Sequence, residues 1–344
     1  MKKSGIFVAS FFGIILIYFI IQNVIPNQET NPSAMPNGDE QLEQPEPQDL
    51  EDDEEQSKPD DIEINPSPSE NDIEDDEYED LPSLSTLQLH SQYATLIRLK
   101  DGKIILDKNS NEKMFPASLT KMMTAIVAIE NITDLEDLIT LPSEIFQPLY
   151  DAEAAMAGFL PNENVPVLDL LYGTLLPSGA EAAVGLAYYV AGSEEAFVEL
   201  MNIKAEELGM KNTHFTNVTG LHDANHYSTA EDMALLLTYA LENEIFTDVF
   251  TSPSYSTQAT NLHPSGITVY STMFKKIENT SLENGKILGG KTGFTDEAGL
   301  CLASVAEVNG ELFILVTAGA SGNNRTEPFN IIDAFTVYNE LVKY

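Results

Sequence analysis

Two short motifs place residues suited to acyl transfer about 170 positions apart in the chain. Ser118 is followed three residues later by Lys121, and the run Lys291-Thr292-Gly293 supplies a second lysine. A serine hydroxyl becomes an effective nucleophile only when a neighbouring base takes its proton. A lysine can be that base if burial and a nearby cation lower its pKa. Together the motifs predict a serine nucleophile, a lysine base and a second lysine close to both.

The segment around Ser118 is suited to holding the nucleophile and its base on one helix face. Pro116 favours the start of a helix, and residues 122–129 are nearly all apolar. This pattern predicts a helix over 118–130 that is buried in the centre of a domain. Because residues i and i+3 are neighbours on a helix, Lys121 can reach the Ser118 hydroxyl.

The second motif is preceded by Gly289-Gly290, in front of two strand-like runs. Glycines on a strand edge let a substrate backbone approach closely and pair as an added strand. Lys291 and Thr292 can then hold a carboxylate. A turn before a strand would explain the glycines but not the lysine and the threonine.

The order of expected elements predicts an α+β protein with an antiparallel sheet. Asp101-Gly102 and Asn309-Gly310 each lie between two strand-like runs, which is typical of hairpins. Helical patterns cover 118–130, 166–176, 180–191, 194–208, 229–242 and 327–343. We expect the first and last hairpins to join one sheet, with the helical middle as a separate subregion.

Residues 1–27 have the pattern of a membrane anchor. Lys2 and Lys3 precede an almost unbroken apolar run from Ile6 to Ile21, and about 20 apolar residues span a bilayer. We expect a cytoplasmic start, one transmembrane signal anchor and an extracytoplasmic remainder, by the positive-inside rule. Although no clear cleavage site follows, a cleaved signal peptide and a secreted protein remain open.

Residues 28–85 contain 22 of the 55 acidic residues but one of the 17 basic residues. So few apolar residues cannot offset the entropy of ordering the chain. We therefore expect a disordered acidic linker, with a cation-binding or partner-binding tail as the alternative, and a catalytic domain over 86–344.

Composition also excludes some classes of function. The formal net charge of −38 argues against a nucleic-acid partner, because the phosphate backbone would repel it. Cys301 is the only cysteine, so an intrachain disulfide is impossible, and its strand pattern predicts a buried core residue. We expect no cofactor.

Four segments extend the two motifs into a longer pattern. They are 116–124 (PASLTKMMT), 175–179 (LLPSG), 220–229 (GLHDANHYST) and 290–299 (GKTGFTDEAG). This combination resembles the low-molecular-mass penicillin-binding proteins, specifically the serine D-alanyl-D-alanine carboxypeptidases, over roughly residues 86–344. The resemblance implies a β-lactamase/transpeptidase-like fold, in which helices flank an antiparallel sheet.

The resemblance also implies a reaction. The enzyme would remove the terminal D-alanine from peptidoglycan stem peptides ending in D-Ala-D-Ala, and β-lactams would acylate the same serine. By resemblance, Ser118 is the acylated nucleophile, Lys121 is its general base and Ser178 relays a proton.

The remaining site residues are also assigned by resemblance. Lys291 and Thr292, with Gly293 beside them, bind the terminal carboxylate, and Arg325 lies near that carboxylate. The backbone N–H groups of Ser118 and Phe294 form the oxyanion hole, which stabilises charge that appears only in the transition state.

One position departs from the family pattern. The middle motif of the family is Ser-x-Asn, but here Ser178-Gly179 is followed by Ala180 and Glu181. Losing one such contact costs on the order of 10²-fold in rate if nothing replaces it. Glu181, a water molecule or a different substrate could compensate. The departure also favours an alternative function, a catalytically weak muropeptide or β-lactam sensor on the same fold.

The sequence argues against two other enzyme classes. A serine β-lactamase needs fast deacylation, and the sequence has no clear glutamate motif for it. A zinc carboxypeptidase would use His214, His222, Asp223 and His226, but H-E-x-x-H is absent and the spacing matches no standard site. We therefore expect no metal, and we interpret this cluster as a structural loop near the active site.

Overall fold

The computed structural model describes residues 84–323 and 325–341. The predicted membrane anchor (1–27) lies outside this range, as does nearly all of the predicted linker (28–85). The described part begins with a short 3-10 helix, Leu84–Thr86, and Leu84 is buried against the sheet. Within this described part, no helix is long and apolar enough to cross a membrane.

Six strands form one antiparallel sheet in the order β2-β1-β10-β9-β8-β7. They are β1 (Tyr93–Arg98), β2 (Lys103–Lys108), β7 (Ser281–Leu282), β8 (Gly285–Thr295), β9 (Gly299–Val308) and β10 (Glu311–Ala320). Strands β1 and β10 pair directly, with Tyr93 opposite Ala318. The two predicted hairpins therefore join one sheet, as expected.

Eight α-helices lie within the described residues. They are α1 (Thr120–Asn131), α2 (Phe146–Asp151), α3 (Val167–Leu175), α4 (Ala180–Ala191), α5 (Glu194–Leu208), α6 (Ala230–Ala240), α7 (Glu244–Thr251) and α8 (Phe329–Leu341). All six predicted helical segments are confirmed, with ends shifted by at most two residues. Helices α2 and α7 were not predicted. Their segments are short and contain Pro148 or β-branched and aromatic residues, which weaken the helical signal.

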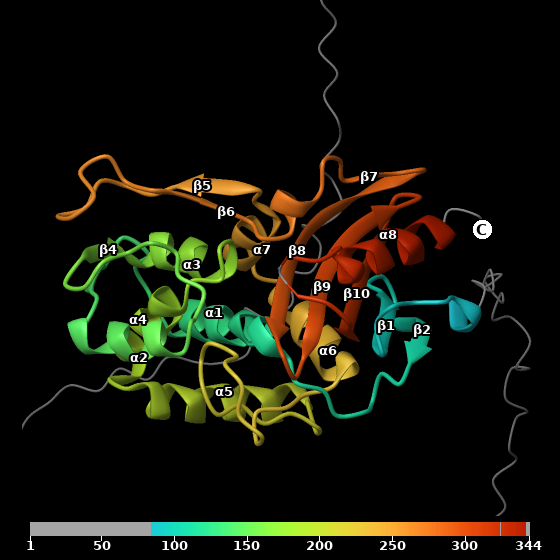
Figure 1. Ribbon diagram of the computed structural model, residues 1–344, viewed down its shortest axis with the longest axis horizontal. Coiled ribbons are helices and arrows are strands. Elements are labelled where there is room, and N and C mark those ends of the chain that lie inside the picture. The colour runs from blue at the N-terminus through green and yellow to red at the C-terminus, as the bar shows by residue number, and fades with distance from the viewer. Residues whose placement is uncertain (1–83, 324, 342–344) are drawn as a thin grey trace, which may run out of the picture. The chain divides into compact units, whose positions relative to one another are not determined.

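Helices cover both faces of the sheet (Figure 1). Helix α8 packs against β9 and β10 on one face, and α6 packs against β10 and β1 on the other. The alternation along β9 explains this arrangement, because successive side chains point to opposite faces. Cys301 and Ala303 belong to the core on the α6 side, whereas Leu302 and Ala306 belong to the core around α8.

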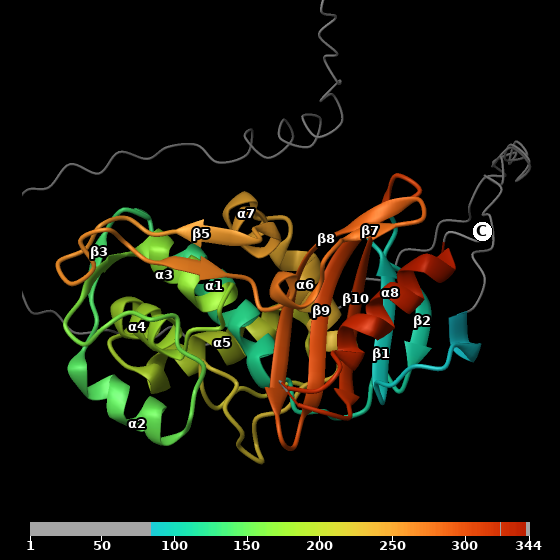
Figure 2. The ribbon, with the colours of Figure 1, turned by 45° about the horizontal axis from the view of Figure 1, so that its top comes forward.

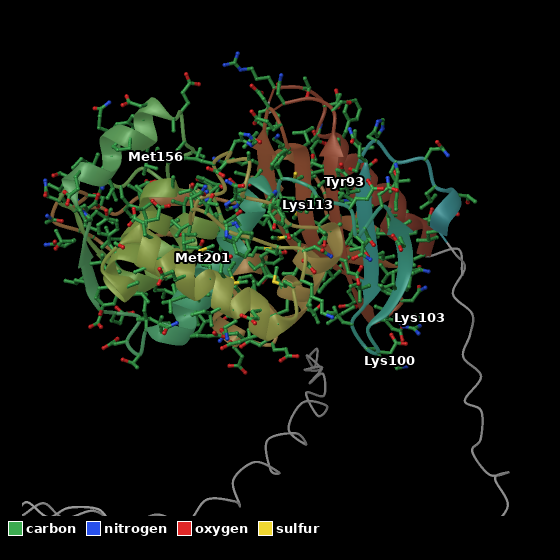
Figure 3. All side chains as sticks on the ribbon, turned by 90° about the horizontal axis from the view of Figure 1, so that it is seen from below. Tyr93, Lys100, Lys103, Lys113, Met156 and Met201 are labelled. Atoms are coloured by element: carbon green, nitrogen blue, oxygen red, sulfur yellow. The ribbon has the colours of Figure 1, made fainter. Side chains whose placement is uncertain are left out.

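Helix α1 connects the sheet half of the molecule with the helical half, and Figure 2 shows it between the strands and α3, α4 and α5. Ten of its 12 residues are buried, which confirms the predicted central helix. Figure 3 shows the two halves from below: Met156 and Met201 lie in the helical half, and Tyr93, Lys100 and Lys103 lie in the sheet half.

Two small sheets were not predicted from the sequence. Strand β3 (Leu138–Thr140) pairs with β4 (Asn164–Pro166), and β5 (Ser254–Ser256) pairs with β6 (Thr268–Tyr270). The β5–β6 ribbon is held to α3 by Tyr255, whose hydroxyl donates to Asp169 at 2.8 Å and whose ring stacks on Tyr172. This ribbon leads into residue 272, beside the second lysine motif.

Candidate active site

Ser118 lies in η2 (Ala117–Leu119), a 3-10 turn that continues directly into α1. Its side chain is partly buried, so it remains accessible. The preceding residue, Ala117, has a φ of +47°, a left-handed conformation that costs an L-residue roughly 1–2 kcal/mol. The turn into α1 therefore presents the nucleophile from a strained backbone.

Lys121 lies one helical turn after Ser118, with its Nζ 3.4 Å from the Ser118 Oγ. The side chain is 2% exposed, and the amine donates to the carbonyl oxygen of Thr219 at 2.6 Å. Burial lowers the pKa of Lys121 to about 7, although the carboxylates of Glu181 and Glu194 oppose this shift. Near neutral pH much of this amine is therefore unprotonated and can accept the serine proton.

Ser178 and Lys291 meet on the opposite side of the same site. Ser178 lies between α3 and α4 with a φ of +69°, and its Oγ accepts a hydrogen bond of 3.0 Å from Lys291 Nζ. Lys291 is 1% exposed. Burial lowers its pKa well below the usual value, and the nearby Lys121 adds to this effect. The structure thus brings two buried lysines and two serines together from segments distant in the sequence.

The edge of β8 next to Ser118 is available for pairing. Strand β7 pairs only with Gly285 and Lys286, and along 291–295 the described strand partner is β9 on the other side. A Cβ at Gly293 would lie 3.0 Å from the backbone nitrogen of Ser118. Glycine therefore allows β8 to approach the nucleophile closely. That these glycines also admit a substrate backbone stays a prediction.

Comparison with known proteins agrees with this geometry. The sequence pattern of the D-alanyl-D-alanine carboxypeptidase family, peptidase S11, matches residues 80–322. The chain belongs to this family. The matched range contains every predicted site residue except Arg325.

Relatives in the D-alanyl-D-alanine carboxypeptidase family cover much of the folded part. DacF of Bacillus subtilis (strain 168), a D-alanyl-D-alanine carboxypeptidase, is 36% identical over 241 residues, which are 69% of this chain and 59% of the relative. DacA of Escherichia coli (strain K12) is 39% identical over 157 residues, which are 43% of this chain and 38% of the relative. The chain thus matches less than two thirds of the length of either relative.

Solved structures show the same fold. The Streptomyces K15 DD-transpeptidase superposes with a TM-score of 0.67 at 24% identity, covering 76% of this chain and all of that one. Penicillin-binding protein 5 of Haemophilus influenzae gives 0.63 at 26% identity, covering 74% and 71%. These matches confirm the predicted transpeptidase-like α+β fold of the family.

Two residues assigned by the family resemblance differ in their position relative to the site. Phe294 follows Gly293 on β8, opposite Leu300, and so lies beside the nucleophile. Arg325 lies in the exposed loop between β10 and α8, where its backbone N–H donates to Asn323.

Glu181 is held from one side by the loop that precedes α3. Its Oε1 accepts three backbone N–H groups, from Ala157 and Gly158 at 2.8 Å and from Phe159 at 3.2 Å. Burial raises the pKa of Glu181, and these N–H groups oppose the rise. The 157–159 loop therefore engages one carboxylate oxygen of Glu181, whereas Oε2 is buried with no hydrogen-bond partner among the described residues. The charge of Glu181 also acts on Lys121, so compensation by Glu181 stays a prediction.

A loop that sequence reasoning did not assign to the site holds the base in place. The carbonyl of Thr219 accepts from Lys121, and the side chain of Asn217 accepts from the N–H groups of Thr219 and Gly220 at 3.1 and 2.7 Å. Glu194 accepts from Val218 N–H at 3.0 Å. The polar residues before Gly220 could have indicated a functional loop. The sequence does not show, however, that this loop contacts α1.

Thr272 is a second residue that sequence reasoning missed. Its Oγ1 lies 2.6 Å from the Oγ1 of Thr292, and its N–H donates to the carbonyl of Leu176 at 3.0 Å. It therefore connects the β8 edge with the segment that leads to Ser178. No local pattern around residue 272 indicates this role.

The histidine cluster forms ordinary hydrogen bonds. His214 Nδ1 lies 2.8 Å from the carbonyl oxygen of Asn225, and His226 is buried and bonded at both ring nitrogens. Across residues 84–323 and 325–341, no group of three or more His, Cys, Asp or Glu side chains could hold a metal ion. Cys301 is fully buried, which raises its pKa to about 12, and the prediction of a core cysteine is confirmed.

Proposed function

We propose that this chain is a serine-type D-alanyl-D-alanine carboxypeptidase that acts on peptidoglycan stem peptides. One relationship carries the proposal: a buried Lys121 with a pKa near 7 lies 3.4 Å from the Ser118 hydroxyl. Apo-state hydrogen bonds of this kind are often long and shorten when substrate binds. The open β8 edge beside this pair suits an extended peptide.

The proposed reaction has two steps. Lys121 accepts the proton of Ser118 as its Oγ attacks the carbonyl carbon of the penultimate D-alanine, and the N–H groups of Ser118 and Phe294 stabilise the oxyanion. The C–N bond then breaks, and Ser178 relays the proton held by Lys121 to the departing amine of D-alanine, which leaves Lys121 neutral again. Water, deprotonated by the same base, hydrolyses the acyl-enzyme and restores Ser118.

The substrate carboxylate would bind beside residues 291–293 of β8, where no second strand pairs with β8 among the described residues. Lys291 and Thr292 lie there, next to Gly293, and Thr292 has its hydroxyl in the polar pair with Thr272. An arriving carboxylate favours the charged form of Lys291, which burial alone disfavours. The assignment of Arg325 to this carboxylate rests on resemblance alone.

The direct test is D-alanine release from a peptide ending in D-Ala-D-Ala. The full-length chain would be assayed in detergent, because residues 6–21 are apolar. We expect release by the wild type, none by Ser118→Ala, and acylation reduced at least 10³-fold in Lys121→Ala. Near-normal β-lactam labelling of either variant would contradict the assignment.

We further propose that residues 1–27 anchor the chain in the cell membrane and that 28–85 tether an extracytoplasmic catalytic domain over 86–344. The apolar run and the acidic composition support this organisation. Deleting 28–85 should leave turnover of a soluble peptide unchanged. A large fall in kcat would show that this segment does more than tether.

A muropeptide or β-lactam sensor is the second candidate, because Ala180 lacks the amide that the family pattern has there. The two functions predict different outcomes in the same assay. A sensor would be acylated on Ser118 by a β-lactam without releasing D-alanine from the peptide.

A further inference from the structure

A buried histidine lies close to the nucleophile but has no part in the reaction described above. His226 is 2% exposed and belongs to the loop that precedes α6. Its Nδ1 lies 3.0 Å from the backbone nitrogen of Thr216, and its Nε2 lies 2.7 Å from Thr120 Oγ1. Thr120, which is fully buried, is the second residue after Ser118.

The partners fix the direction of each hydrogen bond. The backbone N–H of Thr216 can only donate, so Nδ1 of His226 must accept and carries no proton. Thr120 Oγ1 lies 2.8 Å from the carbonyl oxygen of Ala117, which can only accept. The single hydroxyl proton of Thr120 therefore points to Ala117, and His226 Nε2–H must donate to Thr120.

The chain of hydrogen bonds ends on the peptide group that contains the nucleophile's N–H. The carbonyl of Ala117 and the N–H of Ser118 belong to one planar peptide unit and point in opposite directions. Fixing the Ala117 oxygen therefore fixes the direction of the Ser118 N–H. Ala117 has a φ of +47°, and such a conformation persists only where its surroundings hold it.

Two glycines complete the clamp around this peptide group. A Cβ at Gly220 would lie 1.8 Å from the Ala117 oxygen, and one at Gly293 would lie 3.1 Å from the Ala117 Cβ. The Gly220 contact falls on the Ala117 oxygen, and the backbone N–H of Thr120 also donates to that oxygen. The Thr120 hydroxyl adds a side-chain hydrogen bond that holds the carbonyl in this orientation.

We propose that His226 is a positioning residue that acts through Thr120 to hold the Ser118 N–H in the orientation required for the oxyanion hole. The inference rests on the proposed serine acyl transfer, since only a developing oxyanion makes this orientation matter. It also gives the histidine a role other than metal binding, because neither ring nitrogen keeps a free lone pair.

A matched pair of substitutions separates the two ends of the imidazole. In His226→Asn the amide oxygen can replace Nδ1 and accept from Thr216, but the donor to Thr120 is lost. In His226→Gln the amide nitrogen can replace Nε2 and donate to Thr120, but the acceptor for Thr216 is lost. Each variant gives up one hydrogen bond, so similar decreases in Tm are expected.

Catalysis should distinguish the pair. We expect His226→Asn to lower kcat and the β-lactam acylation rate by about 10²-fold with little change in KM, because oxyanion stabilisation acts in the transition state. His226→Gln should stay within about fivefold of the wild type, the effect of roughly 1 kcal/mol. Equal losses that follow Tm in both variants would mean a structural role only and would overturn the proposal.

A second pair of substitutions tests Thr120, which connects His226 with Ala117 in the chain of hydrogen bonds. Thr120→Ser keeps the hydroxyl and should retain most of the acylation rate, whereas Thr120→Val keeps the shape and should lose about 10²-fold. Equal rates for the two would also contradict the proposal.

One further measurement does not depend on the activity. ¹⁵N NMR of the imidazole in the full-length wild type should show a neutral His226 protonated at Nε2. An Nδ1–H tautomer would overturn the inference even if D-alanine is released. A wild type that is acylated by β-lactams but releases no D-alanine would disprove only the carboxypeptidase reaction. The His226 and Thr120 variants would then be compared by their rates of β-lactam acylation.

Discussion

The amine of Lys121 donates a hydrogen bond of 2.6 Å to the carbonyl oxygen of Thr219. A carbonyl accepts but does not donate, so one N–H of the amine is directed away from the nucleophile. When Lys121 is neutral, its lone pair is then free for the proton of Ser118, 3.4 Å away. The Asn217–Gly220 loop thus orients the base as well as burying it.

This arrangement predicts a pH-dependent acylation rate. Burial places the pKa of Lys121 near 7, and only the neutral amine can accept a proton. Below about pH 7 the rate constant should fall roughly tenfold per pH unit, and above it the rate should level off. Stopped-flow labelling with a fluorescent penicillin between pH 5 and 9 would measure this profile. A flat profile would rule out Lys121 as the base.

The same burial predicts that the base lowers stability. The pKa of Lys121 is about 7 in the folded protein, against an ordinary lysine pKa of 10.5. Between these values the unfolded chain binds more protons, so this group makes stability rise with pH over that window. Lys121→Met should therefore raise Tm more at pH 6 than at pH 10 while abolishing acylation. Calorimetry at the two pH values would check this, and a Tm decrease at pH 6 would contradict it.

Much of the site could be predicted because its signals are local. The Ser118–Lys121 spacing, the apolar run of α1 and the glycines before Lys291 each express a constraint within a few residues. The turn residues at 101–102 and 309–310 likewise predicted the strands that they connect. Local chemistry was enough to identify the class of site and the α+β order.

The remainder depends on contacts between distant segments. Nothing near residue 272 indicates that its hydroxyl meets Thr292, and nothing near Thr219 indicates that its carbonyl meets Lys121. The orientation of the Glu181 carboxylate could not be predicted either, because the three N–H groups that bind it come from a loop more than 20 residues earlier. Such contacts arise from packing of the helical half against the sheet.

A close approach of two backbones predicts a large effect for Gly220→Ala. The new Cβ would lie 1.8 Å from the Ala117 oxygen, whereas one at Gly310, which has nearly the same φ, meets nothing within 4 Å. We expect Gly310→Ala to cost about 1–2 kcal/mol without changing acylation. Gly220→Ala should cost more and slow acylation at least about 10²-fold. Tm and β-lactam labelling of both variants would test this; matched acylation rates would contradict it.

The threonine pair on the β8 edge predicts an effect on substrate binding. If Thr272 donates to Thr292 across their 2.6 Å contact, the proton of Thr292 is free for the substrate carboxylate. Thr272→Val should then raise KM for a D-Ala-D-Ala peptide about fivefold, the effect of roughly 1 kcal/mol. Thr272→Ser keeps the hydroxyl and serves as the control. A lower kcat with unchanged KM would place Thr272 in the chemistry instead of in binding.

Replacing Ala180 with asparagine is predicted to increase catalytic efficiency. It begins α4 beside Ser178, is 1% exposed, and its N–H donates to Ala155 at 2.8 Å. An asparagine at 180 would add the side-chain amide that the family pattern has at this position. We expect Ala180→Asn to raise kcat/KM for the peptide by about tenfold or more, the scale of one well-placed polar contact. Ala180→Leu has a similar shape without the amide and should show no gain. Equal rates in wild type and Ala180→Asn, with Tm preserved, would mean that this chain binds its substrate without the contact at 180.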